Sequence, residues 1–317
     1  MAKNNVGFCR EVEDELSARK SRSARIHKRN IEMLKKEHPD ILAIYEGIAD
    51  TAIDFADRIV ASPQDGEALK KLAGDIIASK TAEFKKALAD AGLDPELLEP
   101  VYKCGICRDT GLVDGQMCGC IRQIVIEKNF SGSGVDPEMS FENYRHDLIE
   151  DPRERRANEN ICAFCLDYAD SFPDNALPDM LLLGAPGVGK TYLLNCIGDR
   201  VLKNGYSVLK ISANKLVARV LDSIRDKELE RPDFVLPDLL LIDDLGAEPL
   251  LENITVETLL SILCDRQEEK KATVIASNLD PAALNEYYGE RIVSRLIDVN
   301  RSKVIKITTP SLRRIRI

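Results

Sequence analysis

The sequence predicts an α/β domain built on a parallel sheet, preceded by a mainly helical N-terminal region. Two observations support this fold class. From about residue 136, five short apolar runs alternate with segments of helical periodicity, a pattern typical of parallel strands that are buried on both faces. Residues 1 to about 98 instead carry apolar side chains at steps of three and four, which is the periodicity of helices. A cysteine-rich segment lies between the two regions.

The 317-residue chain has an ordinary globular composition, with 44% hydrophobic and 31% charged residues. It lacks an apolar run long enough for a transmembrane helix, which needs about 18 residues. Its first residues turn acidic where a signal peptide would be apolar, so we expect a cytoplasmic protein with no membrane partner. The formal net charge of −9 argues against a general nucleic-acid coat protein, although a local basic strip is compatible with it.

The helical region contains two apolar series, separated by the breaker "SPQDG" at 62–66. The second series begins near Leu69, includes Leu72, and reaches Leu88. We expect both faces to be buried, either against each other or against another protein. The first series predicts one helical face made of Ile41, Ile44, Tyr45, Ile48, Ala52, Phe55, Ala56 and Ile59.

The five apolar runs are the expected strands: "DMLLLG" (179–184), "YSVLKIS" (206–212), "PDLLLIDD" (237–244), "ATVIASN" (272–278) and "KVIKIT" (303–308). The most linker-like stretch is "SGSG" at 131–134, and we expect the domain boundary there. The sequence therefore predicts three parts: a helical domain over 1–98, a cysteine-containing segment with a connecting helix over 99–130, and the α/β domain over 136–317.

The turn after the first apolar run carries a phosphate-binding motif. "GAPGVGKT", residues 184–191, fits G-x-x-x-x-G-K-[ST] at every fixed position and is followed by a helical segment. Backbone N–H groups in such a turn surround phosphate oxygens at a helix start. We expect Lys190 to reach the β- and γ-phosphates and Thr191 to hold Mg²⁺. The expected nucleotide contacts are Gly184, Gly187, Val188, Gly189, Lys190 and Thr191.

Paired aspartates end the third apolar run, about fifty residues beyond the glycine-rich turn. A nucleotide-bound magnesium ion needs an acidic residue at the tip of a neighbouring strand. Asp243 is expected to hold Mg²⁺, directly or through water, and Asp244 to orient the attacking water. The spacing favours this function over an acidic pair that merely ends a strand.

These motifs resemble those of AAA+ ATPases. More narrowly, "LLLIDDLGAE" and "GERIVSRL" are similar to the DnaC/DnaI-type replicative helicase loaders and to the related IstB transposition helper ATPases. The resemblance covers about residues 136–317. It implies that Asn278 is sensor 1, that Arg295, or else Arg291, is an arginine finger for a neighbouring subunit, and that Arg313 belongs to sensor 2. It also implies ATP and Mg²⁺ as cofactors and self-association through the AAA+ domain.

The second aspartate departs from the pattern of many AAA+ proteins, which have Asp-Glu at this place. The shorter side chain of Asp244 draws the carboxylate back by one methylene. IstB-like relatives share this feature. We therefore expect slow hydrolysis that works as a switch.

The cysteine segment contains four thiols that can close a tetrahedral metal site: Cys104, Cys107, Cys118 and Cys120. No histidine is nearby and the spacing fits neither common ferredoxin pattern, so Zn²⁺ is the expected ion. Unmetallated thiols or a redox pair are the alternatives. Four protein ligands leave no open position, which predicts a structural site. Cys162 and Cys165 are expected in the core, where free cysteine is common.

The resemblance implies an ATP-dependent loader that delivers a DnaB-type replicative helicase onto single-stranded DNA in replication initiation or restart. It implies that the N-terminal domain binds the helicase and that the ATPase domain contacts single strands. Two alternatives remain. One is an IstB-like transposition helper ATPase, which binds duplex DNA and a transposase. The other is a metal-stapled adaptor whose nucleotide site is vestigial.

Overall fold

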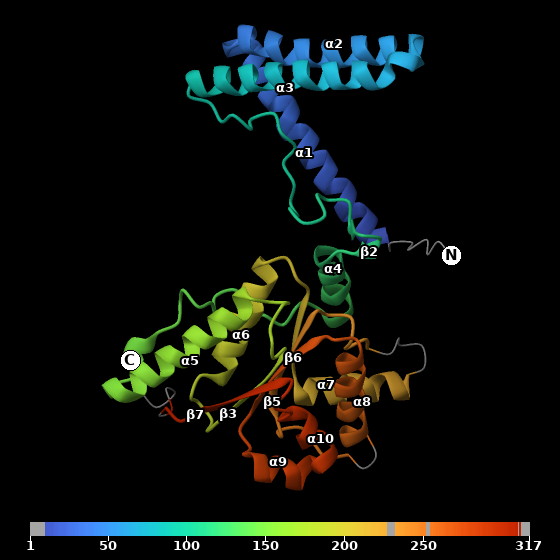
Figure 1. Cartoon of the computed structure of the whole chain (residues 1–317). Coiled ribbons are helices and arrows are strands. Elements are labelled where there is room, and N and C mark those ends of the chain that lie inside the picture. The colour runs from blue at the N-terminus through green and yellow to red at the C-terminus, as the bar shows by residue number, and fades with distance from the viewer. Residues whose placement is uncertain (1–9, 227–231, 252–253, 310, 312–317) are drawn as a thin grey trace. The chain divides into compact units, whose positions relative to one another are not determined.

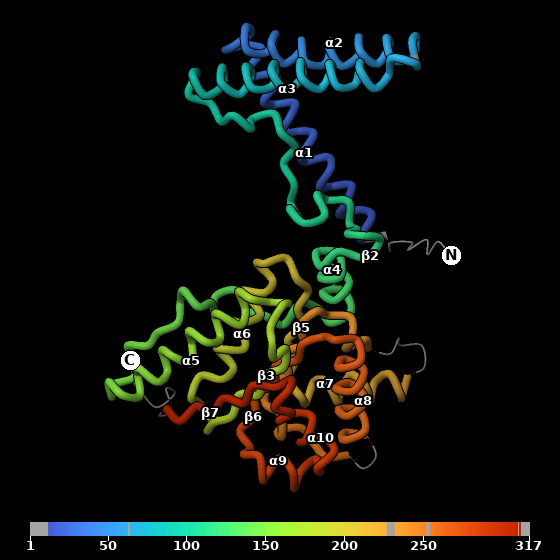
Figure 2. Tube along the Cα trace, viewed as in Figure 1, coloured from blue at the N-terminus to red at the C-terminus, as the bar shows by residue number. Residues whose placement is uncertain are grey.

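The computed structural model describes residues 10–226, 232–251, 254–309 and 311. The chain divides into two compact units, residues 1–110 and 111–317 (Figure 1, Figure 2). Within the described ranges, none of the helices combines the length and the apolarity that crossing a bilayer requires.

The first unit is helical, as the sequence predicts. Its elements are α1 (Arg10–Glu37), α2 (Pro39–Ala61), a short 3₁₀ turn (Pro63–Asp65) and α3 (Gly66–Asp90). Helices α2 and α3 lie side by side (Figure 1). The core of the unit gathers where the start of α2 meets the end of α3, and it consists of Leu34, Ile41, Leu42, Phe84, Leu88 and Leu98.

Two parts of the predicted apolar faces are not buried. Ala52 and Ala56 of α2 are exposed, and Leu72 of α3 is 48% exposed. The steps of three and four identified the helices correctly. They overestimated the width of the buried faces, because in the outer part of the hairpin each helix packs mainly against one neighbour.

The second unit is built on a five-stranded sheet with the order β4-β5-β6-β3-β7, and all of its neighbouring strands are parallel. This confirms the predicted fold class, and each strand agrees with one of the predicted runs to within two residues at either end. The strands are β3 (Asp179–Gly184), β4 (Val208–Ser212), β5 (Leu239–Leu245), β6 (Ala272–Ser277) and β7 (Ser302–Ile307).

Helices cover both faces of the sheet, because successive strand residues point to opposite sides. Met180 and Leu182 of β3 belong to one core, with α5 (Pro152–Asp170) and α6 (Lys190–Lys203). Leu181 and Leu183 belong to the other core. That second core is completed by α7 (Ala213–Arg225), α8 (Thr255–Glu268), α9 (Pro281–Tyr288) and α10 (Glu290–Leu296).

The connection into the sheet runs through β1 (Leu112–Val113), β2 (Gln116–Met117) and α4 (Gly119–Phe130). Arg122 of α4 donates from Nη2 to both carboxylate oxygens of Asp238, at 2.8 Å each. The predicted linker at 131–134 follows the edge strand, since Lys210 N donates to Ser133 O at 2.8 Å. A Cβ on Gly134 would lie 2.0 Å from Lys210 O, so this close approach requires glycine.

A buried guanidinium links the loop before β5 to the start of β6. Arg266 is fully buried. Its nitrogens donate to Thr273 Oγ1 at 3.0 Å and to the carbonyls of Phe234 at 2.8 Å and Pro237 at 3.0 Å, and also to the carbonyls of Asp238 and Ala272. Burial lowers the pKa of Arg266 to about 10. A single side chain thus provides hydrogen-bond donors for the backbone carbonyls before β5 and at the start of β6.

We predict that Arg266→Met destabilises the second unit by about 3 kcal/mol or more, because the thioether keeps much of the volume but leaves several buried carbonyls without donors. The melting temperature should fall by about 6 °C or more. Scanning calorimetry of the full chain measures the effect. Arg225→Met, at an exposed position at the end of α7, is the matched control, and equal shifts for the two variants would contradict this account.

Candidate functional site

The glycine-rich turn joins the end of β3 to the start of α6. Gly187 and Gly189 have φ values of +88° and +97°, which L side chains rarely adopt. A Cβ on Gly184 would lie 2.6 Å from Ile307 O of β7. Each fixed glycine of the motif therefore has a local reason, and the turn leads directly into the first residues of α6.

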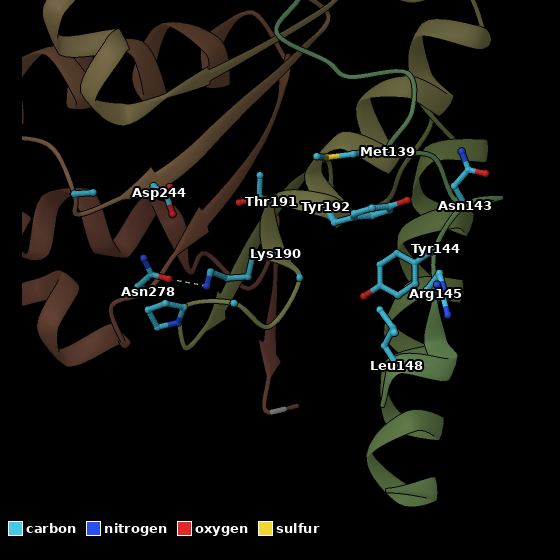
Figure 3. A pocket seen from close by; sticks show the side chains of 14 residues that line it. Met139, Asn143, Tyr144, Arg145, Leu148, Lys190, Thr191, Tyr192, Asp244 and Asn278 are labelled. Carbon is cyan, nitrogen blue, oxygen red and sulfur yellow. Dashed lines mark hydrogen bonds between the residues drawn. The ribbon is translucent and has the colours of Figure 1, made fainter. Parts of the chain in front are cut away.

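Lys190 is 4% exposed, and its ammonium is held by three oxygens. Nζ donates to Gly184 O at 2.8 Å, to Ala185 O at 2.9 Å and to Asn278 Oδ1 at 2.7 Å (Figure 3). Asn278, the expected sensor 1 residue, comes from the end of β6 and lies beside the turn. The structure thus brings together two residues that are 88 positions apart in the chain.

The first aspartate of the pair lies beside the start of α6. Asp243 is 6% exposed, and its Oδ1 accepts from Thr191 Oγ1 at 3.1 Å. Its Oδ2 is 3.7 Å from Lys210 Nζ on the neighbouring strand. Burial raises the pKa of the Asp243 carboxyl, and the Lys210 ammonium opposes that rise. Thr191 and Asp243 offer a hydroxyl and a carboxylate oxygen, which are ligands that Mg²⁺ accepts.

The second aspartate occupies an irregular point of β5. The register with β6 shifts between Ile242 and Leu245, and Asp244 has φ +54°. Asp and Asn reach this left-handed region more readily than most residues. Asp244 is exposed, and it lines the same cavity as Lys190, Thr191 and Asn278.

This cavity has a volume of about 650 Å³, within the range typical of small-molecule sites. One wall comes from the segment that precedes α5 and was not among the predicted site residues. Figure 3 shows Tyr144, Arg145 and Leu148 across from Asp244 and Asn278. The lining residues that the sequence motifs missed include Met139, Asn143, Tyr144, Arg145, Leu148 and Tyr192.

A hydrogen-bond network holds Tyr144 against the glycine-rich turn. A Cβ on Gly189 would lie 3.1 Å from Tyr144 Oη. That hydroxyl accepts from Asn158 Nδ2 at 3.2 Å, and Asn158 Oδ1 lies 3.0 Å from His146 Nδ1. The rings of Tyr144 and Tyr192 meet edge to face, with 5.1 Å between centroids. Burial raises the pKa of Tyr144 to about 12, so the phenol stays protonated at neutral pH.

The expected finger arginines do not line the cavity. Arg291 and Arg295 lie on α10, where Arg295 Nη1 donates to Arg291 O at 2.8 Å. Arg291 is exposed and Arg295 is partly exposed. The expected sensor 2 residue, Arg313, lies outside the described residues.

A buried carboxylate connects the loop after Asp244 to the end of α9. Glu248 is 3% exposed, and it accepts hydrogen bonds from Gly246 N at 2.9 Å and from the Tyr288 hydroxyl. Tyr287 Oη donates to Glu248 O at 2.7 Å. Glu248 thus joins the segment that follows β5 to the end of α9, and α10 begins two residues after Tyr288. None of the sequence motifs indicated this connection.

The four predicted metal ligands lie together. The sulfurs of Cys104, Cys107, Cys118 and Cys120 are all within 4.8 Å of one another, and three of these residues are buried. Zn–S bonds of about 2.3 Å in a tetrahedron place sulfurs about 3.8 Å apart. The donor set therefore fits Zn²⁺, with four thiolates and no position left for a substrate.

Local backbone geometry assembles this cluster. β1 and β2 form a hairpin whose two-residue turn is Asp114 and Gly115, with φ values of +51° and +79°. Cys118 N donates to Gly111 O at 2.9 Å. Asp109 is buried, and its carboxylate accepts from Cys104 N at 3.0 Å. The glycines and aspartates between the cysteine pairs are thus turn residues and backbone acceptors.

Three cysteines of the second unit lie in its core. Cys162, Cys165 and Cys196 are buried on α5 and α6, as the sequence predicts for the first two. Burial raises the pKa of Cys162 to about 11 and that of Cys165 to about 12. Such thiols stay protonated at neutral pH and are inert.

Comparisons with known proteins agree with this geometry. Residues 166–316 match the family described as IstB-like ATP binding protein. The chain is 28% identical over 163 residues to the replicative helicase loader DnaC of Buchnera aphidicola subsp. Baizongia pistaciae, which covers 50% of this chain and 62% of that protein. It is 27% identical over 183 residues to DnaC of Escherichia coli K12, and this match covers 55% of this chain and 71% of that protein.

The solved structures that resemble the chain include a crystal structure of the DnaC helicase loader. The TM-score is 0.44 at 23% identity, and the match covers 53% of this chain and 97% of that one. The relatives above are matched over about half of this chain, and the Buchnera protein over less than two thirds of its own length. Residues 166–316 therefore match the IstB-like ATP-binding family, and about half of the chain is similar to proteins named as replicative helicase loaders.

Proposed function

We propose that the chain is an ATP-dependent loader of a replicative helicase onto single-stranded DNA, and that it works as a slow ATPase switch in the cytoplasm. One observation carries the proposal. One cavity is lined by six predicted residues from the turn, from β5 and from the end of β6: Gly187, Gly189, Lys190, Thr191, Asp244 and Asn278. The relatives of this domain include proteins named as replicative helicase loaders. Those relatives favour loading over the transposition helper function.

Nucleotide binding would replace protein contacts that already exist. The carbonyls of Gly184 and Ala185 now accept from Lys190, so the ammonium lies at the turn where a β- or γ-phosphate is expected. Bound Mg²⁺ would neutralise phosphate charge, and Thr191 and Asp243 would hold it. The wall formed by Tyr144 and Leu148 gives the rest of a nucleotide an apolar surface.

Slow hydrolysis is supported by the length and the exposure of Asp244. Its carboxylate is one methylene shorter than that of glutamate, and the side chain is open to solvent. A water-orienting group must lie within hydrogen-bond reach of the nucleophile. Asn278, bonded to Lys190, is the second candidate for positioning that water.

Self-association through the AAA+ domain would complete the site. Arg291 and Arg295 lie away from the cavity of their own chain, so a contact with nucleotide would have to come from a neighbouring subunit. A guanidinium suits this task because it is permanently charged and binds phosphate oxygens in a forked geometry. Arg313 remains the expected sensor 2 residue.

The helicase contact is assigned to the N-terminal unit, because the family match begins only at residue 166. The zinc cluster would stabilise the short segment that contains it, as metal binding supplies folding free energy where there is little core. Single-stranded DNA would be contacted by the ATPase domain.

We predict that Lys190→Ala weakens ATP binding at least about 100-fold, because it removes the charge that faces the phosphates. Isothermal titration calorimetry with ATP and Mg²⁺ measures the affinity. Lys215→Ala, at an exposed position on α7, is the matched control and should bind normally. Normal ATP affinity in Lys190→Ala would contradict the assignment of the site.

We predict that the purified chain contains one zinc ion, and that Cys104→Ser or Cys118→Ser loses it, since three thiolates bind zinc less tightly than four. Elemental analysis by mass spectrometry gives the metal content. Cys162→Ser changes a buried core thiol instead and should retain zinc. Iron in place of zinc, or full zinc content in the Cys104→Ser variant, would show the site to be wrong.

The function itself is tested with the replicative helicase of the same organism. We expect the two proteins to co-elute in size-exclusion chromatography with ATP present, and the complex to place the helicase on single-stranded DNA. The absence of a complex with any nucleotide would remove the proposal. ATP-dependent filaments on duplex DNA would favour the transposition helper, and loading that is unchanged in Lys190→Ala would favour the adaptor with a vestigial site.

A further inference from the structure

Helix α2 has an exposed apolar row on the side that faces away from α3. The row, here called the α2 outer face, consists of Ala49, Ile53, Ala56 and Val60. Ile53 is 61% exposed and Val60 is 80% exposed. The steps of four, three and four residues are those of a seam that packs against another helix. The alanines leave hollows between the two larger side chains.

An acidic row runs directly beside this face. Glu46, Asp50, Asp54 and Asp57 are all exposed. At 100° per residue, each of them lies within about a quarter turn of the direction of Ile53, on the side away from Ala56. Asp54 is 3.6 Å from Arg58. The acidic row gives one edge of the α2 outer face a negative potential.

Among the residues that the structure describes, no second layer covers this region. The main core of the unit lies at the start of α2 and the end of α3. Beyond Gly47, the buried residues of the two helices up to Ala73 are Phe55, Gly66 and Ala73. A helix that is apolar on two sides stabilises a domain only when both sides are covered.

We infer that the α2 outer face docks one amphipathic helix of a partner protein, whose apolar edge is flanked by lysine or arginine residues. This inference rests on the proposed function, in which the partner is the helicase. The apolar row would supply the buried centre of the contact and the acidic row its rim. Opposite charges along that rim would select the partner and speed encounter.

A second copy of the chain is a poorer occupant. Antiparallel pairing of two α2 outer faces sets one acidic row against the other, which like charges oppose. Parallel pairing offers neither acidic row a basic partner, because Arg58 is the one basic residue of α2 and lies on the acidic side. The basic helix of the chain, α1, does not offer an apolar row in exchange. Among the described side chains of α1, no large hydrophobic residue is exposed.

The test uses two synthetic helical peptides that share one leucine and alanine seam, one flanked by lysines and the other by glutamates. Fluorescence anisotropy measures their binding to the full chain. We expect the lysine-flanked peptide to bind and the glutamate-flanked peptide not to bind. The double variant Ile53→Glu with Val60→Glu should bind the lysine-flanked peptide at least about tenfold more weakly.

Two controls separate this face from general charge effects. Val299→Glu adds a charge at a position that is 82% exposed in the second unit, and it should bind the peptide as the wild type does. Asp50→Lys with Asp57→Lys should weaken binding, whereas Asp75→Lys on α3 should not. Circular dichroism checks that each variant remains helical.

The outcomes distinguish the two proposals. Failure of the lysine-flanked peptide to bind, or equal binding by wild type and the double variant, overturns the docking face. If the helicase binds the wild type and the double variant equally, the face is wrong and the loader function stands. If the peptide binds as expected but the helicase does not, the loader function fails and the face stands. Self-association in the wild type that is lost in the double variant would make a second copy the occupant and overturn the inference.

Discussion

The hydrogen bond between the Lys190 ammonium and Asn278 joins the turn after β3 to the end of β6. It is possible because the sheet is parallel, so that the carboxyl ends of β3, β5 and β6 meet at one edge. The polar groups that the sequence motifs predicted for the candidate nucleotide site depend on that shared edge. Asp243 reaches Thr191 there, and Asp244 faces the same cavity.

The sequence allowed the glycine-rich turn, the strands and the cysteine cluster to be predicted because each depends on local signals. A fixed spacing specifies the turn around Lys190, and a run of apolar residues specifies a buried strand. The cysteine cluster could be predicted from spacing as well, since a short hairpin with its turn at Asp114 and Gly115 separates the two cysteine pairs. These parts of the site are determined within a few residues of chain.

Other parts could not be predicted, since they depend on contacts between distant segments. Tyr144 reaches Gly189 only because the chain before α5 folds back over the turn, and no local periodicity indicates this. The hydrogen bonds of Glu248 with Gly246 and Tyr288 are of the same kind. The exposure of Ala52 and Ala56 shows a different limit of the sequence prediction. A helical period identifies the apolar face of a helix, but it does not tell how many neighbouring elements cover that face.

The left-handed backbone conformation at Asp244 limits which residues can replace this aspartate. Glutamate would extend the carboxylate toward a bound triphosphate, but it reaches positive φ less readily than aspartate does. A protein with glutamate at this position would also need a different backbone conformation at the bulge in β5. If Asp244 orients the attacking water as proposed, the reach of its carboxylate and the geometry of the strand are coupled at this residue.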